Sequence, residues 1–195
     1  MSKHDPSATP LIRVSPSGVH GLGAFATRPL PAFALLGLYE GRRYTPKQIA
    51  AKEWNDQLTY LFTLSNQETI DGAKGGNATR HLNHSCEPNC EAVEEYDDAG
   101  KLILKFQTLQ PVDAGEELFI DYCLTADDGS SPEDYPCHCG APNCRGTMLA
   151  PVEAEEQEPS DASVGLAEEP EQIHRPPTDP AHAAKPHQVP SPSGA

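Results

Sequence analysis

Residues 77–90 limit most strongly what this chain can fold into. They read Asn-Ala-Thr-Arg-His-Leu-Asn-His-Ser-Cys-Glu-Pro-Asn-Cys, with few apolar side chains and several that bind metals or form turns. Pro88 fixes its own φ and disfavours a helical conformation at Glu87, so the chain is expected to turn there. Such a segment fits either a polar surface loop or a stretch buried against a ligand and a metal. Two later segments favour the second interpretation.

Residues 137–144, Cys-His-Cys-Gly-Ala-Pro-Asn-Cys, form the first of these segments. A disulfide between Cys137 and Cys139 would be strained at this spacing. Three thiolates on a short, turn-rich loop instead suit tetrahedral Zn²⁺, which takes four nitrogen or sulfur ligands. The spacing leaves the fourth ligand open between Cys86, the natural candidate, and His138, the local alternative. Two further cysteines are expected to be buried free thiols: Cys90 and Cys123.

Short apolar, aromatic and β-branched runs, separated by Gly, Pro and Asp turn signals, predict a mainly β protein with few short helices. One helix is expected from Pro46 to about Trp54, because Thr45 is a good N-cap and proline suits the first helical position. Ile49 and Trp54 are its candidate buried residues. Strands are expected at residues 11–14, 33–39, 58–64, 69–71, 91–96, 102–109 and 117–122.

The net charge of −15 argues against a nucleic-acid-binding protein, since phosphate contacts need clustered Lys and Arg. It is compatible with a basic partner such as a Lys- and Arg-rich peptide, although acidic proteins without such a partner are common. No run of about 18 apolar residues predicts a membrane span. Residues 1–6 lack a signal-peptide pattern, so a reducing, intracellular compartment is expected, and the cysteines are interpreted as ligands or thiols.

Composition divides the chain into five regions. Residues 1–10 and 151–195 are expected to be disordered; the second region has nine prolines, no aromatic residue, and nine acidic against two basic residues. Residues 124–136 are predicted to form a flexible acidic connector. The main folded domain is expected at residues 11–123, and the zinc module at residues 137–150.

Four motifs, within roughly residues 11–149, together resemble the SET-domain protein lysine methyltransferases that carry a post-SET zinc module. These motifs are Gly21-Leu22-Gly23, residues 77–89, Gly115-Glu-Glu-Leu-Phe-Ile-Asp-Tyr122, and Cys137-x-Cys-x4-Cys-Arg-Gly146. The resemblance implies a SET-domain fold of small, mostly antiparallel sheets with a C-terminal pseudoknot, a rare exception to un-knotted connections. It also implies that Tyr122 lies beside Asn83 and His84.

The resemblance further implies residue roles. Tyr122 and Tyr60 are expected to be catalytic, and they line the lysine channel together with Ile120. Met148 and Leu149 are expected to give the cofactor apolar cover. The expected S-adenosylmethionine contacts are Gly21, Leu22, Gly23, Arg80, Asn83, His84 and Tyr122. The expected ligands of a structural Zn²⁺ are Cys86, Cys137, Cys139 and Cys144.

The implied activity is methyl transfer from S-adenosylmethionine to a lysine side chain of a histone or another basic protein. The alternative is a catalytically silent SET domain that binds peptides. Gly75 favours the alternative, because many relatives have tyrosine there near the cofactor. Ile120 stands where many relatives have Phe or Tyr, which hints at room for more than one methyl group. A monomer without membrane or nucleic-acid partners is expected, cytoplasmic if bacterial and nuclear if eukaryotic or delivered to a host.

Overall fold

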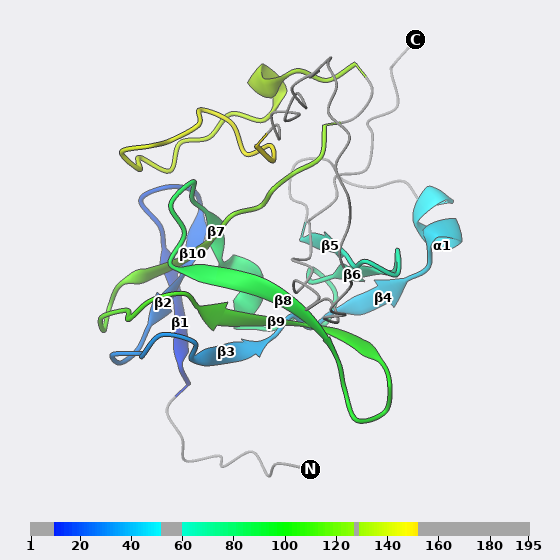
Figure 1. The fold of residues 1–195 in the computed structure, drawn as a ribbon, viewed down its shortest axis with the longest axis horizontal. Helices are drawn as coiled ribbons and strands as arrows, with labels where there is room; N and C mark the ends of the chain where they lie inside the picture. The colour runs from blue at the N-terminus through cyan, green and yellow to red at the C-terminus, as the bar shows by residue number, and fades with distance from the viewer. Residues whose placement is uncertain (1–9, 52–59, 127–128, 152–195) are drawn as a thin grey trace, which may run out of the picture.

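The computed structural model describes residues 10–51, 60–126 and 129–151. Within these ranges the chain forms ten strands in three small sheets, one α-helix and two short 3₁₀ helices (Figure 1). The prediction of a mainly β fold with few helices is therefore confirmed. The predicted N-terminal and C-terminal regions, 1–10 and 151–195, lie almost entirely outside the described residues. No described helix is long and apolar enough to cross a membrane.

The first sheet has the strand order β1-β2-β10-β7. Its β2 and β10 pair in antiparallel fashion, whereas β10 and β7 run parallel, with Phe119 opposite Asn83 and Ile120 opposite His84. This pairing brings Asn83 and His84 beside the end of β10, as predicted. The strands are β1 (Ile12–Pro16), β2 (Leu22–Ala26), β7 (Asn83–His84) and β10 (Glu117–Ile120).

The second sheet has the order β3-β9-β8 and contains the longest hairpin. Alternate residues of β9 are buried, because one face of the strand packs on the core. A turn joins β8 to β9: Asp97 Oδ1 accepts the backbone N–H groups of Ala99 and Lys101, and Gly100 takes a φ of 73°. The strands are β3 (Leu35–Leu38), β8 (Cys90–Tyr96) and β9 (Leu102–Thr108).

The third sheet is small and has the order β4-β6-β5, with antiparallel pairs throughout. Its strands are β4 (Arg42–Tyr44), β5 (Leu61–Thr63) and β6 (Thr69–Asp71). The helix α1 (Pro46–Ala50) follows β4, and Thr45 and Gln48 form a capping box at its start. Ile49 is half-buried rather than buried, and Trp54 lies outside the described residues.

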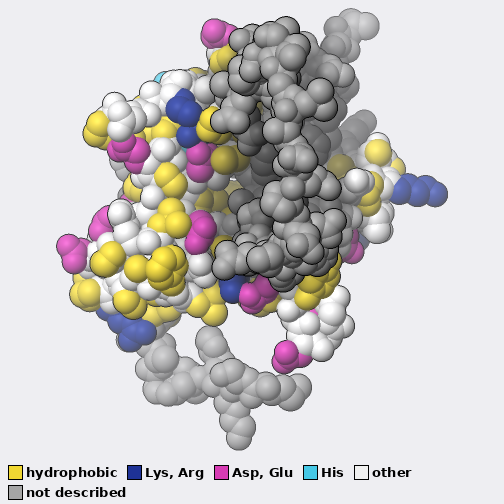
Figure 2. All heavy atoms as spheres, in the orientation of Figure 1, with side chains coloured by type: hydrophobic (Ala, Val, Ile, Leu, Met, Phe, Trp, Pro, Cys, Tyr) yellow, Lys and Arg dark blue, Asp and Glu magenta, His cyan; other side chains and the backbone are white. Residues whose placement is uncertain are grey.

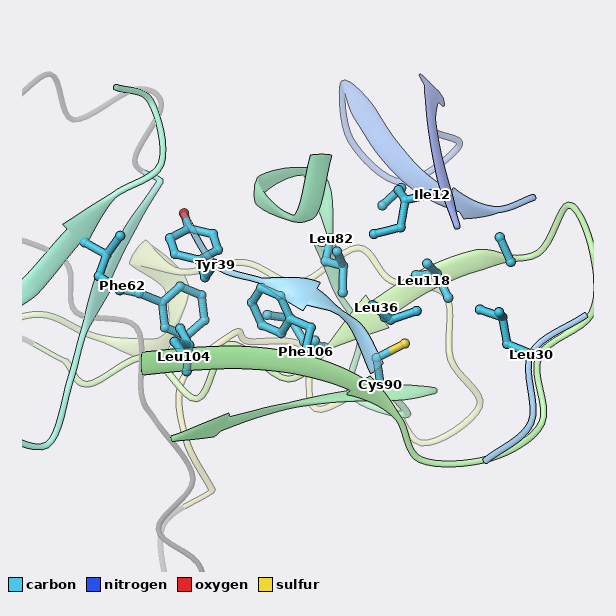
Figure 3. Close-up of a cluster of buried hydrophobic side chains, with 14 of the residues drawn as sticks. Ile12, Leu30, Leu36, Tyr39, Phe62, Leu82, Cys90, Leu104, Phe106 and Leu118 are labelled. Atoms are coloured by element: carbon cyan, nitrogen blue, oxygen red, sulfur yellow. The ribbon is translucent and has the colours of Figure 1, made fainter. Parts of the chain in front are cut away.

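The core lies between the sheets and ends in an aromatic cluster. The ring centroids of Tyr39 and Phe62 lie 4.9 Å apart, and that of Phe106 lies 5.7 Å from each of them. Figure 3 shows these side chains in the buried cluster. Tyr39 donates its hydroxyl hydrogen to the backbone oxygen of Tyr60 at 2.7 Å. This bond fixes the start of the third sheet to the core and so positions Tyr60.

Residues 121–126 and 129–150 lie over one end of the first sheet (Figure 1). Leu124 donates its N–H to the Met148 oxygen, and Ala150 donates to the Leu124 oxygen. The 3₁₀ helix η2 (Pro132–Asp134) interrupts the predicted connector. The other 3₁₀ helix, η1 (Ala78–His81), begins the polar segment, with Asn77 as its N-cap. The backbone bonds of Leu124 hold the cysteine-rich loop against the chain that follows β10.

Several details of the sequence prediction are wrong. The helix expected to reach about Trp54 ends at Ala50, and strands β2, β4 and β7 were not predicted. The strand predicted to end at Tyr122 ends at Ile120, because Asp121 accepts the backbone N–H of Cys123, whose φ is 44°, and the chain turns away from the sheet. Cys123 is half-buried rather than buried, since it lies on this turn, whereas Cys90 is fully buried in the core.

Candidate functional site

A cavity of about 560 Å³ lies where the first sheet, the third sheet and the cysteine-rich loop meet. Most of the predicted cofactor and channel residues line it: Gly21, Leu22, Tyr60, Arg80, Asn83, His84, Ile120 and Tyr122. Met148, Cys137 and Cys139 line it from the C-terminal side. Gly23, Cys86, Cys144 and Leu149 are outside this lining. The fold thus brings residues from five distant segments to one hollow.

Residues 17–23, here called the glycine turn, form one wall of the cavity. Gly21 has a φ of 49°, and its oxygen accepts the backbone N–H of Ser17 at 2.9 Å. A Cβ atom at Gly23 would lie 2.1 Å from Oε1 of Glu117. The positive φ therefore favours glycine at Gly21, and a side chain at Gly23 would have to displace the end of the Glu117 side chain.

Asn83 joins the glycine turn to β10. Its amide nitrogen lies within hydrogen-bonding distance of three acceptors: the oxygens of His20 and Leu22 at 3.3 and 3.2 Å, and Oε1 of Glu117 at 2.9 Å. Ser17 donates its hydroxyl hydrogen to the other oxygen of Glu117 at 3.0 Å. The amide therefore turns its donor side to the turn and its oxygen away from it.

Glu117 is a site residue that the sequence analysis missed. Its carboxylate holds both Asn83 and Ser17, and it occupies the space next to Gly23. The only signal in the sequence was its place inside the Gly-Glu-Glu-Leu motif. Its role depends on the pairing of β10 with β2, which a linear sequence does not display.

Tyr122 is fixed at both its backbone and its side chain. Its N–H donates to Nδ1 of His84 at 3.1 Å, and its hydroxyl donates to the Leu82 oxygen at 3.0 Å. Burial, and then the neighbouring Tyr60 and Glu117, raise the pKa of the Tyr122 hydroxyl above its usual value. The phenol is therefore neutral at physiological pH and can donate a hydrogen bond into the cavity wall.

Tyr60 lies in a second group of polar side chains. The Arg80 guanidinium carbon lies 5.7 Å from the centre of the Tyr60 ring, and the His81 ring meets it edge-on at 5.9 Å. Arg80 donates from Nε to Nε2 of His81 and from Nη1 to the Gly72 oxygen. Arg80 thus contacts the Tyr60 wall and the turn after β6, and His81 joins the site without having been predicted.

Four cysteine thiols meet beside the cavity: Cys86, Cys137, Cys139 and Cys144. Their Sγ atoms all lie within 4.8 Å of one another, and the Cys86 and Cys137 atoms are 3.7 Å apart. A tetrahedron with Zn–S bonds of 2.3 Å needs S–S separations of about 3.8 Å, so this four-thiol cluster fits Zn²⁺. His138, the local alternative as fourth ligand, is exposed and stands outside the cluster.

An ion pair links this cluster to the end of β10. Arg145 donates from both terminal nitrogens to the two oxygens of Asp121, each at 2.8 Å. Although burial raises it, these bonds hold the pKa of Asp121 below its usual value. Asp121 stands between two cavity residues, Ile120 and Tyr122, so the cysteine-rich loop is attached next to the core of the site.

The sequence of this chain is similar to that of known proteins. The family model of the SET domain matches residues 21–123. The chain is 33% identical over 142 residues to histone-lysine N-methyltransferase SETD1 of Drosophila melanogaster, a match covering 70% of this chain and 8% of that protein. It is 37% identical over 133 residues to histone-lysine N-methyltransferase SETD2 of Mus musculus, covering 66% of this chain and 5% of that protein.

A solved structure supports the same likeness. The structure of ctPRC2 in an autoinhibited conformation bound to S-adenosylmethionine matches with a TM-score of 0.53 and 26% identity. The match covers 59% of this chain and 15% of that chain. This chain therefore spans a small part of the length of each of these relatives.

Proposed function

We propose that this chain, which belongs to the SET-domain family, transfers a methyl group from S-adenosylmethionine to the side-chain amine of a lysine in a protein. One observation carries the proposal: the glycine turn, Asn83, His84 and Tyr122 line one cavity although they come from distant segments. The names of the relatives, histone-lysine N-methyltransferases, support the same reaction class.

The methyl donor would lie against the glycine turn. Backbone groups at Gly21 and Leu22 line the cavity and can approach the donor closely, because Gly21 has no side chain. Asn83 would hold this turn in place for the donor, because its amide nitrogen binds the backbone oxygens of His20 and Leu22. Bound S-adenosylmethionine would supply an activated methyl group on a sulfonium.

The lysine would enter from the side of Tyr60 and Ile120. Methyl transfer is an in-line displacement, in which the amine nitrogen forms a bond to the methyl carbon as the carbon–sulfur bond breaks. The amine must be neutral, and burial among apolar and aromatic walls favours that form. Tyr122 and the Leu82 carbonyl can hold the amine in line and stabilise the polarised methyl group.

The substrate is proposed to be a histone or another basic protein. The chain carries a net charge of −15, so a lysine-rich segment would be attracted to it. On the face in Figure 2, acidic side chains are scattered among apolar ones, and basic side chains form small groups. An intracellular site of action is proposed, nuclear where the substrate is chromatin and cytoplasmic in a bacterium.

A catalytically silent SET domain that binds a peptide is the second candidate. Gly75 favours it, because the expected aromatic contact with the cofactor is absent at that position. Gly75 has a φ of 75°, a Cβ atom added there would meet no atom within 4 Å, and Gly75 is not among the residues that line the cavity. A titration of the protein with S-adenosylmethionine separates the two candidates.

The test is transfer of labelled methyl groups from S-adenosylmethionine to core histones and to a lysate of source cells. The wild type, Tyr122→Phe and a chelator-treated sample are compared. Label on a discrete band in the wild type alone supports the proposal and identifies the substrate. Absence of binding in the S-adenosylmethionine titration would overturn it and favour the silent domain.

A further inference from the structure

Two chains of hydrogen bonds start at the Cys86 sulfur; one ends at Tyr122 and the other at Asp121, the residue before it. One passes through the His84 side chain, whose two ring nitrogens contact Cys86 and the Tyr122 backbone. The other passes through Arg145, whose backbone N–H donates to the same sulfur and whose side chain binds Asp121. Because Asp121 and Tyr122 are neighbours in the chain, the two chains of hydrogen bonds form a closed loop at the end of β10.

The chemistry of imidazole fixes the direction of the first connection. Tyr122 offers a backbone N–H to Nδ1 of His84 at 3.1 Å, and a backbone N–H can only donate, so Nδ1 carries a lone pair. In the neutral ring the hydrogen is then on Nε2. Nε2 lies 3.4 Å from Sγ of Cys86, which therefore accepts it. His84 is buried, so water does not replace either bond.

This arrangement suits a metal-bound thiolate. Zn²⁺ with four thiolates carries a net charge of −2, and N–H donors to the sulfurs offset that charge. Cys86 receives two such donors, from His84 and from Arg145. Both donors become stronger partners when the sulfur is a thiolate, because charge-assisted hydrogen bonds are shorter and stronger.

We propose that His84 is a positioning residue that couples metal occupancy of the four-thiol cluster to the placement of Tyr122. With a metal bound, the Cys86 sulfur would be fixed as a ligand and would hold the His84 ring through its Nε2–H, while Nδ1 of the same ring holds the Tyr122 N–H. Arg145 holds Asp121, the residue that directly precedes Tyr122. Loss of the metal then loosens Tyr122 without any direct contact between them.

The inference rests on the proposed metal site but does not need methyl transfer. Zinc affinity and amide hydrogen exchange can both be measured on protein that methylates nothing. Failure of the proposed function would therefore leave the coupling testable, and failure of the coupling would leave the proposed function in place.

Two substitutions at one position separate the two halves of the connection. In His84→Gln the terminal amide nitrogen can reach the place of Nε2, so it keeps the donor to Cys86 and loses the acceptor for Tyr122. In His84→Asn the amide oxygen can reach the place of Nδ1, so it keeps the acceptor and loses the donor. A role in packing alone would affect both variants in the same way.

Zinc affinity is measured by competition with a chromophoric chelator, and exchange of the Tyr122 amide by NMR, with Phe106 in β9 as reference. His84→Asn is expected to bind zinc about 10–100-fold more weakly, while His84→Gln stays near the wild type. The Tyr122 amide should exchange faster in His84→Gln with zinc bound. In the wild type, zinc removal should have the same effect while Phe106 keeps its protection.

Two results would overturn the inference. One is wild-type zinc affinity in both variants; the other is a Tyr122 amide whose exchange does not depend on zinc. Arg145→Gln provides a second measurement if the His84 variants fail to fold. It keeps the backbone donor to Cys86 but removes the ion pair with Asp121, so it should speed exchange at Tyr122 while zinc affinity stays within a few fold. Unchanged exchange in this variant would count against the coupling.

Discussion

The hydroxyl group of Tyr122 donates a hydrogen bond to the backbone oxygen of Leu82 at 3.0 Å, although 40 residues separate them. Leu82 directly precedes the Asn83–His84 strand, and His84 accepts the backbone N–H of the same tyrosine. Both ends of Tyr122 are therefore set by one segment. The direction of its hydroxyl follows from the parallel pairing of β7 and β10.

Tyr122→Phe is expected to lower the rate of methyl transfer roughly 10²–10³-fold, the usual effect of removing one donor aimed at the reacting centre. Zinc content and the affinity for S-adenosylmethionine should change little, since the backbone bonds stay. Initial rates with saturating S-adenosylmethionine provide the measurement. Tyr96→Phe is the matched control, because Tyr96 is 71% exposed. Full activity of Tyr122→Phe would remove the tyrosine from the mechanism.

Gly23→Ala is expected to weaken S-adenosylmethionine binding up to about tenfold. The added Cβ would collide with Oε1 of Glu117 and displace that carboxylate from Asn83 and Ser17, and a lost hydrogen bond costs about 0.5–1.5 kcal/mol. Isothermal titration calorimetry measures the dissociation constant. Gly18→Ala is the control, since no atom lies within 4 Å of its Cβ position. Equal affinities in the two variants would contradict this account of Gly23.

Ile120→Tyr is expected to shift the products toward fewer methyl groups per lysine. Ile120 is buried and lines the cavity, so a larger ring with a hydroxyl group would fill space otherwise open to the methylated amine. The overpacking should also cost about 1–3 kcal/mol of stability. Mass spectrometry of a methylated lysine peptide gives the product ratio. Ile120→Leu serves as the volume-matched control, and identical ratios in all three proteins would refute the idea.

Cys86→Ser is expected to abolish stable zinc binding, because it removes one of four thiols in a tetrahedral set. The wild type should retain about one zinc per chain after dialysis. Metal analysis and S-adenosylmethionine titration are made on the same samples, and cofactor affinity should fall together with zinc. Cys123→Ser provides the comparison, since Cys123 lies outside the cluster. Full zinc content in Cys86→Ser would mean that another residue is the fourth ligand.

The stability of the protein should respond to pH through His81. Burial, and then the charge of Arg80, lower the pKa of His81 below its usual value. As the pH falls through about 6.5, His81 of the unfolded chain binds a proton that the folded protein does not bind. The free energy of unfolding is therefore highest above that pH and decreases as the pH falls. His81→Phe should show a smaller fall in the urea midpoint between pH 7 and pH 5. Parallel curves for the two proteins would exclude this role.

Much of the local structure could be read from the chain. The strand at residues 102–109 and the helix start at Thr45 and Pro46 depend on neighbouring residues, so they were predictable. The resemblance to a known family added the site: it named the four thiols and placed Asn83 and His84 beside Tyr122. The Cys-x-Cys-x4-Cys spacing alone left the fourth ligand undecided.

The sequence by itself determined the β class and seven of the ten strands, but not β2, β4 and β7. It also determined which residues carry metal-binding and polar chemistry, and that the cysteines of residues 137–144 act together. The tertiary structure decided how that chemistry is connected: Glu117 beside Gly23, His81 against Tyr60, and Arg145 on Asp121. The physical reason is that strand propensity and ligand type belong to local stretches of chain. The partner of a buried side chain is instead set by which strands pair, and the parallel pairing of β7 with β10 joins segments that no local interaction brings together.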